Sequence, residues 1–190
     1  DPSLLRLGGE TKTMTFLFSD IVGFTPISEK LQADPQALVE LINRLLTQLT
    51  DCVLRHGGTV DKFMGDCIMA FWGAPLDCED HAERAMLTAR DMLSILDDLN
   101  RQLDEEGLPH LNVGVGINSG PCVVGNMGSQ SRFDYSVLGD AVNVASRLEG
   151  QTRNYDAWIL MGESTVQYKP DWADYVDAIQ VKGKSEPLKV

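Results

Sequence analysis

The sequence predicts an α/β sandwich in which helices pack against one mainly antiparallel sheet. Short strand-forming runs come in adjacent pairs, as in hairpins, and long helical segments separate the pairs, as crossovers do. The resulting order, β-α-β-β-α-β-β-α-β-β, predicts a ferredoxin-like βαββαβ core followed by additional C-terminal strands and a helix.

The first two elements are a buried strand and a long helix. Residues 13–19 are strand-forming and contain the apolar run Phe16, Leu17 and Phe18, so they are expected to form a buried strand. Asp34 and Pro35 supply an N-cap and a first-turn proline, and Gly57 follows the last periodic residue, so a helix is expected over about 35–56. Its expected apolar face comprises Val39, Ile42, Leu46, Leu49 and Val53.

A hairpin and a second helix come next. The runs TVDKFM and CIMAFW are joined through Gly65 and Asp66, which predicts a tight turn between two strands. A helix is expected from Asp80, with Glu83 in the position of a capping box, to near Gly107. Its expected apolar face comprises Ala82, Ala85, Met86, Ala89, Leu93 and Leu96.

The remaining elements are a second hairpin, a third helix and short strands. The runs LNVGVGIN and CVVGNMG alternate around Ser119, Gly120 and Pro121, which predicts a glycine-rich hairpin. The third helix is expected from Asp140 to about Glu149, and the runs WILM, AIQV and LKV predict short strands after it.

Length and composition predict one globular domain over residues 1–190, with a loose lead-in over residues 1–12. The longest apolar run, CIMAFW, is far shorter than the roughly 20 residues that cross a bilayer, so no direct membrane contact is expected from this segment. The absence of a secretory signal predicts a cytoplasmic location. Widely spaced cysteines without a CxxC pair are expected to be reduced thiols: Cys52, Cys67, Cys78 and Cys122.

A net charge of −12 makes nucleic-acid binding unfavourable, because the chain and a phosphate backbone repel each other. A small polyphosphate that binds together with divalent cations is still compatible with this charge, since bound ions change the local electrostatics.

Two aspartates are candidate metal ligands. Asp20 ends the first strand, and Asp66 lies in the turn of the first hairpin, so both carboxylates are expected at one edge of the sheet. With a backbone carbonyl such as that of Ile21, they form an oxygen site that suits Mg²⁺. Gly23 then allows a tight turn whose amides face phosphate oxygens. Alone, however, these aspartates fit a turn cap and a hairpin turn equally well.

Three further polar residues are weaker candidates. Lys62 lies within an apolar strand, where it is either a solvated side chain or a hydrogen-bond donor to a base. Asn143 and Arg147 are spaced i, i+4 and therefore share one helix face. One interpretation is that they hold a sugar and neutralise a phosphoryl group; the other is that they form a polar stripe on the surface.

Four separated motifs resemble those of the class III nucleotidyl cyclases, in the same order: FLFSDIVGFT, DKFMGDCIMAFWGAP, VGVGINSGPCVVGNMGS and DYSVLGDAVNVASRLE. The resemblance extends from about Gly9 to the KGK at 182–184. It implies conversion of a nucleoside triphosphate to a 3′,5′-cyclic monophosphate and pyrophosphate. It also implies that Asp20 and Asp66 hold two Mg²⁺ or Mn²⁺ ions.

The resemblance also assigns substrate-binding roles. Lys62 and Ser136 match the two positions that read the purine, and Asn143 and Arg147 match the ribose-orienting and transition-state residues. The triphosphate-binding positions, matched more loosely, are Arg132 and Lys182.

Lysine and serine at the purine-reading positions favour ATP over GTP, because Lys62 donates to adenine N1 and Ser136 accepts from the exocyclic amine. Serine places the chain in the Thr/Ser subclass of adenylyl cyclases, some of which respond to bicarbonate or CO₂. Family members build each site across a head-to-tail dimer, and this chain matches both halves, so a homodimer with composite active sites is expected.

Three other functions remain as alternatives. A guanylate cyclase is one, and a catalytically silent cyclase-like module that regulates a partner or dimerises is another. A phosphatase with an aspartate-rich loop after its first strand is the third; such enzymes generally need a second acid two residues after the first, where this chain has Val22.

Overall fold

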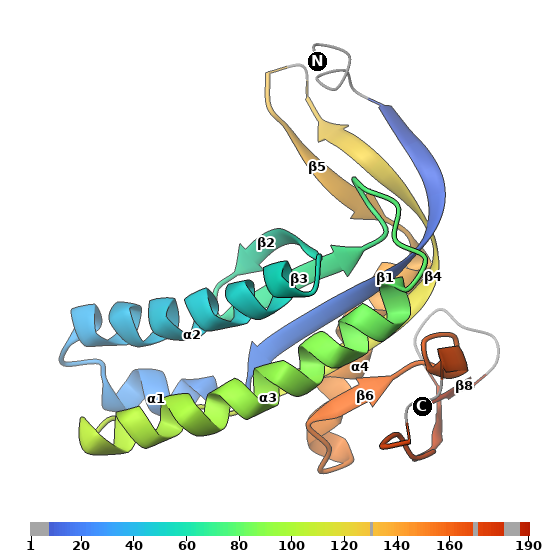
Figure 1. Cartoon of the computed structure of the whole chain (residues 1–190). Helices are drawn as coiled ribbons and strands as arrows, with labels where there is room; N and C mark the ends of the chain where they lie inside the picture. The colour runs from blue at the N-terminus through green and yellow to red at the C-terminus, as the bar shows by residue number, and fades with distance from the viewer. Residues whose placement is uncertain (1–7, 130, 169–170, 181–186) are drawn as a thin grey trace.

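The structure is a computed structural model that describes residues 8–129, 131–168, 171–180 and 187–190. Its main body is one curved sheet with helices on both sides (Figure 1). In chain order the elements are β1 (Gly8–Ile21), α1 (Phe24–Lys30), α2 (Pro35–Arg55), β2 (Thr59–Met64), β3 (Cys67–Trp72), α3 (His81–Glu105), β4 (Val113–Gly128), β5 (Phe133–Leu138), α4 (Asp140–Gln151), η2 (Thr152–Asn154), β6 (Ile159–Met161), η3 (Val166–Tyr168), β7 (Ala178–Ile179) and β8 (Leu188–Lys189).

The sheet has the order β2-β3-β1-β4-β5, and β6 pairs in parallel with β4. The other pairs are antiparallel, and β7 and β8 form a separate two-stranded sheet. The order β2-β3-β1-β4, with α2 and α3 as the crossovers, is that of a ferredoxin-like core. The predicted fold class is therefore confirmed.

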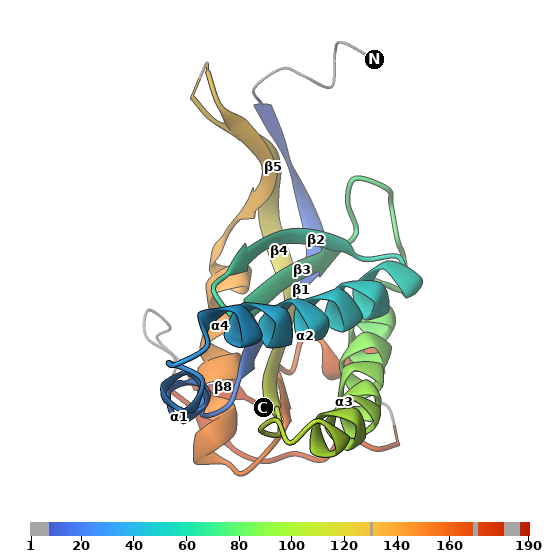
Figure 2. The same cartoon turned by 90° about the vertical axis from the view of Figure 1, so that its left-hand side faces the viewer.

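Two apolar layers hold the helices to the sheet. Helices α2 and α3 cover one face, where Leu17, Ile68, Trp72 and Val115 are buried against them. Helix α4 covers part of the opposite face, which is referred to below as the α4 face (Figure 2). Its buried side chains come from β1, β3, β4, β5 and α4 and include Phe16, Phe18, Met69, Phe71, Val124, Val137, Ala141 and Ala145.

Helix α2 has the predicted bounds, and Leu49 and Val53 of its predicted apolar face are buried, but the rest of the buried face differs from the prediction. The predicted residue Val39 is 55% exposed, whereas Leu41 and Leu45 are buried. Two adjacent stripes of α2 both have helical spacing, and only contact with the sheet and α3 selects between them. The predicted face of α3 is correct except that Leu93 is only partly buried.

The predicted hairpin around Pro121 is wrong, because β4 runs through this segment as one strand and pairs with β1 along its whole length. On its other side β4 pairs with β6 only at 115–117 and with β5 only at 123–128. Pro121 lies in the gap between these partners, where β4 is an edge and a missing N–H is tolerated. Strand β5 and helix α1 were not predicted, and β1 begins at Gly8 rather than near residue 13.

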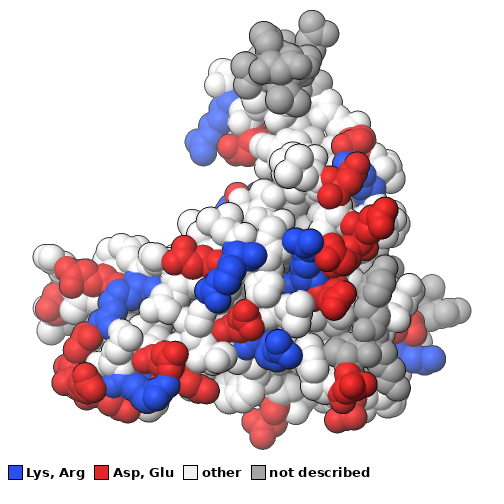
Figure 3. Space-filling model, viewed as in Figure 1, with Lys and Arg blue, Asp and Glu red and all other residues white. Residues whose placement is uncertain are grey.

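The ends of β1, β4 and β5 extend beyond the helices as an arm (Figures 1 and 2). On the face that carries α2 and α3, acidic and basic side chains are interspersed (Figure 3). The four cysteines are free thiols, as predicted. Among the described residues, none of the helices has the length and apolar character that crossing a bilayer requires.

Candidate active site

The site begins with two carboxylates that the sheet brings together. Strands β1 and β3 are neighbours, and Ser19 lies opposite Ile68 in their register. Asp20 continues β1 past this pair, and Asp66 lies in the turn that leads into β3, so the two residues meet at one edge of the sheet. The carboxyl group of Asp66 lies close enough to that of Asp20 to raise its pKa. The predicted convergence of these aspartates is what the fold produces.

The electrostatics of this pair favour a proton or a cation. Burial raises the pKa of Asp20 to about 6, and the hydrogen bond and repulsion from Asp66 add to the effect. Two contacts partly oppose the rise: the Ile21 N–H donates to Asp20 Oδ1 at 3.1 Å, and Arg153 Nη2 lies 3.8 Å from Asp20 Oδ2. The pair therefore carries excess negative charge in a partly buried site.

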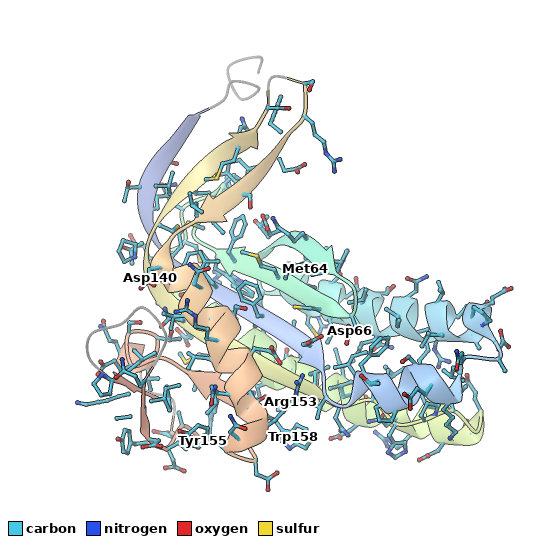
Figure 4. The ribbon with its side chains drawn as sticks, turned by 180° about the vertical axis from the view of Figure 1, so that it is seen from behind. Met64, Asp66, Asp140, Arg153, Tyr155 and Trp158 are labelled. Carbon is cyan, nitrogen blue, oxygen red and sulfur yellow. The ribbon has the colours of Figure 1, made fainter. Side chains whose placement is uncertain are left out.

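A third carboxylate lies behind the pair. Glu149 on α4 is only 9% exposed, and its Oε1 has no hydrogen-bond partner among the residues that the structure describes. Burial and, next, repulsion from Asp20 raise the pKa of Glu149 to about 7. Arg153 Nη2 lies 3.7 Å from Glu149 Oε1, so one guanidinium bridges Glu149 and Asp20. Figure 4 shows Asp140 and Arg153 at opposite ends of the α4 region. Asp66 lies toward the end that carries Arg153.

Sequence reasoning missed Glu149 and Arg153. A signal for Glu149 was present, because it continues the buried stripe of Val142 and Ala145 at helical spacing. A carboxylate in such a stripe is costly unless it is paired, and Arg153 follows it at i+4.

Close packing of α4 on β4 puts Glu149 in this position. A Cβ atom on Gly116 would overlap the backbone of Ala145 and Glu149, and one on Gly114 would overlap the Thr152 side chain. These glycines of β4 therefore let the helix backbone approach the sheet more closely than any side chain would allow.

The polar pair of α4 faces away from the acidic cluster of its own chain. Asn143 is exposed and Arg147 is partly buried, and the predicted stripe beneath them is buried. At about 100° per residue, they lie roughly 120–160° around the helix from Glu149.

The other predicted site residues lie on separate elements. Lys62 is on β2 with a side chain that is 49% exposed, and Ser136 is buried on β5 opposite Gly125. Arg132 is exposed at the tip of the β4–β5 arm, where its carbonyl accepts from the Ser129 N–H. Lys182 lies outside the described residues. Gly23 has a left-handed φ of 71° and precedes α1, as the predicted turn requires.

The donor set fits hard divalent cations. Among the described residues, His, Cys, Asp and Glu side chains form no cluster of three or more that is arranged to hold a metal. Two carboxylates and a backbone carbonyl are, however, the few protein ligands that Mg²⁺ takes when it keeps water and phosphate oxygens as its others. The raised pKa of Asp20 agrees with such a site, since a bound cation would offset the burial of this carboxylate and the repulsion from Asp66.

Strand order and site together define a ferredoxin-like α/β domain with a two-carboxylate centre. Residues 9–189 match the family described as the adenylate and guanylate cyclase catalytic domain. The chain belongs to this family.

Individual relatives agree with this assignment. The chain is 39% identical over 186 residues to an adenylate cyclase of Anabaena cylindrica, covering 95% of this chain and 36% of that protein. It is 34% identical to adenylate cyclase 1 of Rhizobium meliloti, covering 93% and 27%. The chain thus spans about a third of the length of these relatives or less.

Solved structures have the same fold. The adenylyl cyclase CyaB from P. aeruginosa superposes with a TM-score of 0.88 at 37% identity, covering 96% of this chain and 94% of that one. The guanylyl cyclase Cya2 superposes with a TM-score of 0.86 at 36% identity, covering 96% and 92%.

Proposed function

We propose that this domain is an adenylate cyclase that converts ATP to 3′,5′-cyclic AMP and pyrophosphate. The observation that carries the proposal is the meeting of Asp20 and Asp66, from different elements, with a pKa of Asp20 raised to about 6. Relatives named as adenylate cyclases support the choice of reaction. We further propose that residues 1–190 form a single catalytic domain that acts in the cytoplasm, where ATP is available.

Asp20, Asp66 and the Ile21 carbonyl would hold two divalent ions, Mg²⁺ or Mn²⁺. Such ions, when bound, supply charge that favours ionisation of the ribose 3′-hydroxyl and stabilises the phosphates. Arg153 balances the charge of Asp20 from the protein side. We assign no side chain as the general base; the proton of the 3′-hydroxyl would pass to solvent or to a phosphate oxygen of the substrate.

Helix α4 would bind the ribose and the reacting phosphoryl group. Asn143 orients the sugar, and Arg147 stabilises negative charge that develops on the α-phosphoryl oxygens. Loss of one such group typically lowers the rate by about 10²–10³. Arg132 and Lys182 would bind the triphosphate.

These residues would act across a symmetric dimer. The orientation of Asn143 and Arg147 away from the acidic cluster supports this arrangement. Exposed apolar side chains on both faces of β2, β4 and β5 are available for contacts with a second chain: Phe63, Met64, Val123, Tyr135 and Leu138.

Lys62 and Ser136 would select adenine, with Lys62 donating to N1 and Ser136 accepting from the amine. Guanylate cyclase activity is the second candidate, because the similarity to Cya2 is nearly as high as that to CyaB. Bicarbonate or CO₂ is proposed as an effector on the basis of Ser136 alone, and a flat cyclic AMP rate across added bicarbonate at constant pH would contradict it.

The test is product formation by the purified chain with equal ATP and GTP, with Mg²⁺ or Mn²⁺ and then with EDTA. We expect more cyclic AMP than cyclic GMP, and none with EDTA. A larger yield of cyclic GMP would establish the guanylate cyclase alternative. No product with either metal would favour the catalytically silent module.

Mixing two inactive variants tests the shared site. Asp20→Asn removes the metal-binding half of each active site, and Arg147→Ala removes the half that binds the phosphoryl group. A heterodimer of the two variants keeps one site with both halves intact, so the mixture should regain about one working site per heterodimer. Mixtures that stay inactive, although both variants dimerise, would contradict the composite site.

A further inference from the structure

Strand β2 contains an irregularity next to Lys62. Val60 lies opposite Ala70 on β3, but Lys62 lies opposite Met69, so Asp61 is an extra residue without its own partner. This is a β-bulge, in which two residues of one strand face one residue of the other.

The bulge determines the face on which Lys62 lies. In an unbroken register Lys62 would lie opposite Ile68, whose side chain is buried against α2 and α3. Because of the extra residue it lies opposite Met69, which belongs to the α4 face. Directly opposite residues of a sheet share a face. The insertion of Asp61 therefore moves Lys62 from the face that carries α2 and α3 to the α4 face.

The carboxylate of Asp61 is unusual in its surroundings. Its side chain is only 1% exposed, and within the described part of the chain neither oxygen has a hydrogen-bond partner. Its Oδ2 lies 3.1 Å from Lys62 Nζ, and the Lys62 side chain is 49% exposed. A buried carboxylate without other partners destabilises the fold, so its neighbouring ammonium group is the contact that compensates it.

We propose that Asp61 is a positioning residue that directs the Lys62 ammonium group toward the purine and thereby contributes to base selection. This inference rests on the proposed function, because only there is Lys62 the reader of the base. A lysine side chain has many rotamers, and a fixed carboxylate beneath its ammonium group limits them before the substrate binds. Asp61 itself does not touch the nucleotide.

The test compares Asp61→Asn, which keeps the side-chain volume and removes the charge, with the unaltered chain. We measure kcat and KM for ATP and for GTP, and thermal stability. The ratio of kcat/KM for ATP over GTP should fall about fivefold, mainly through KM for ATP, at the strength typical of a partly exposed ion pair. Asp61→Glu, which keeps the charge, should retain part of the preference.

A double-mutant cycle distinguishes a role of Asp61 in positioning Lys62 from a role in stabilising strand β2 alone. In a Lys62→Met background, Asp61→Asn should change the ATP over GTP ratio by less than twofold, because the group it positions is gone. An equal fall in both backgrounds would overturn the proposal, and so would an unchanged ratio in the unaltered background.

Asp91→Asn is the matched control. It removes an aspartate whose Oδ2 lies 2.8 Å from His56 Nε2 on the opposite side of the sheet, and it should leave the ratio unchanged. A comparable fall in this variant would show that the ratio responds to general destabilisation, which would overturn the assignment to Asp61.

A second readout needs no catalysis. The rate at which an amine-reactive acylating reagent modifies Lys62, measured by mass spectrometry relative to exposed Lys30, should rise severalfold in Asp61→Asn. If the unaltered chain makes no cyclic nucleotide, the proposed function fails while this result still tests the Asp61–Lys62 contact. An unchanged labelling rate would overturn the contact itself.

Discussion

Neutralising Asp20 should stabilise the metal-free protein while it abolishes catalysis. The pKa of Asp20 rises from 3.8 to about 6 on folding, first through burial and then through Asp66. A rise of this size corresponds to about 3 kcal/mol against the ionised form. Because 29% of the side chain is exposed, solvent screening reduces this to about 1–2 kcal/mol. Asp20→Asn should therefore raise Tm in EDTA at pH 7.5 by about 2–8 °C.

The pH dependence follows from the sign of this change. Asp20 is easier to ionise in the unfolded chain, so its favourable contribution is complete below pH 3.8 and is lost as pH rises through about 6. The difference in stability between Asp20→Asn and the unaltered chain should therefore be small at pH 4 and reach its full value above pH 6.

Chemical unfolding at several pH values in EDTA measures this difference in stability. The complementary experiment repeats the unfolding with added Mn²⁺. Manganese should raise the stability of the unaltered chain far more than that of Asp20→Asn, because ligands that bind only the folded state stabilise it. An Asp20→Asn variant that is less stable than the unaltered chain at pH 7.5 in EDTA would refute the account of the acidic pair.

The remaining predictions concern the contact between α4 and the sheet. Gly116→Ala should destabilise by about 3 kcal/mol or more and lower Tm by about 6–12 °C, because its Cβ overlaps the α4 backbone. Gly150→Ala, also near the end of α4 but with no atom of the described residues within 4 Å of its Cβ, is the control and should stabilise slightly; equal Tm values for the two would contradict this packing. Glu149→Gln should stabilise the metal-free protein at pH 8 and not at pH 4, since the pKa of Glu149 is raised to about 7. Urea unfolding at both pH values measures this, and a loss of stability at pH 8 would count against the prediction.

Local signals predicted much of this fold. Asp34 and Pro35 mark the start of α2, where the Asp34 side chain accepts from the Ala37 N–H. Gly65 and Asp66 mark the β2–β3 turn. Caps and turns depend on residues a few positions apart, so the sequence contains all the information needed to find them.

The predictions from sequence were wrong where contact with an element far along the chain determines the local structure. Pro121 indicates a turn by its chemistry, but its place between β5 and β6 makes an uninterrupted β4 possible. The buried stripe of α2 likewise depends on what covers it. Asp61 reads as one more residue of an apolar strand, and its role as a bulge is visible only in the register with β3.

The sequence by itself determined the order of most elements, the fold class, the family and the pair Asp20 and Asp66, because short-range patterns and motif spacing carry that information. Tertiary structure alone decided that Glu149 and Arg153 join this pair and that Lys62 lies on the α4 face. The physical reason is that burial, strand register and electrostatic contact join residues far apart along the chain, and such distances exist only once the sheet has formed.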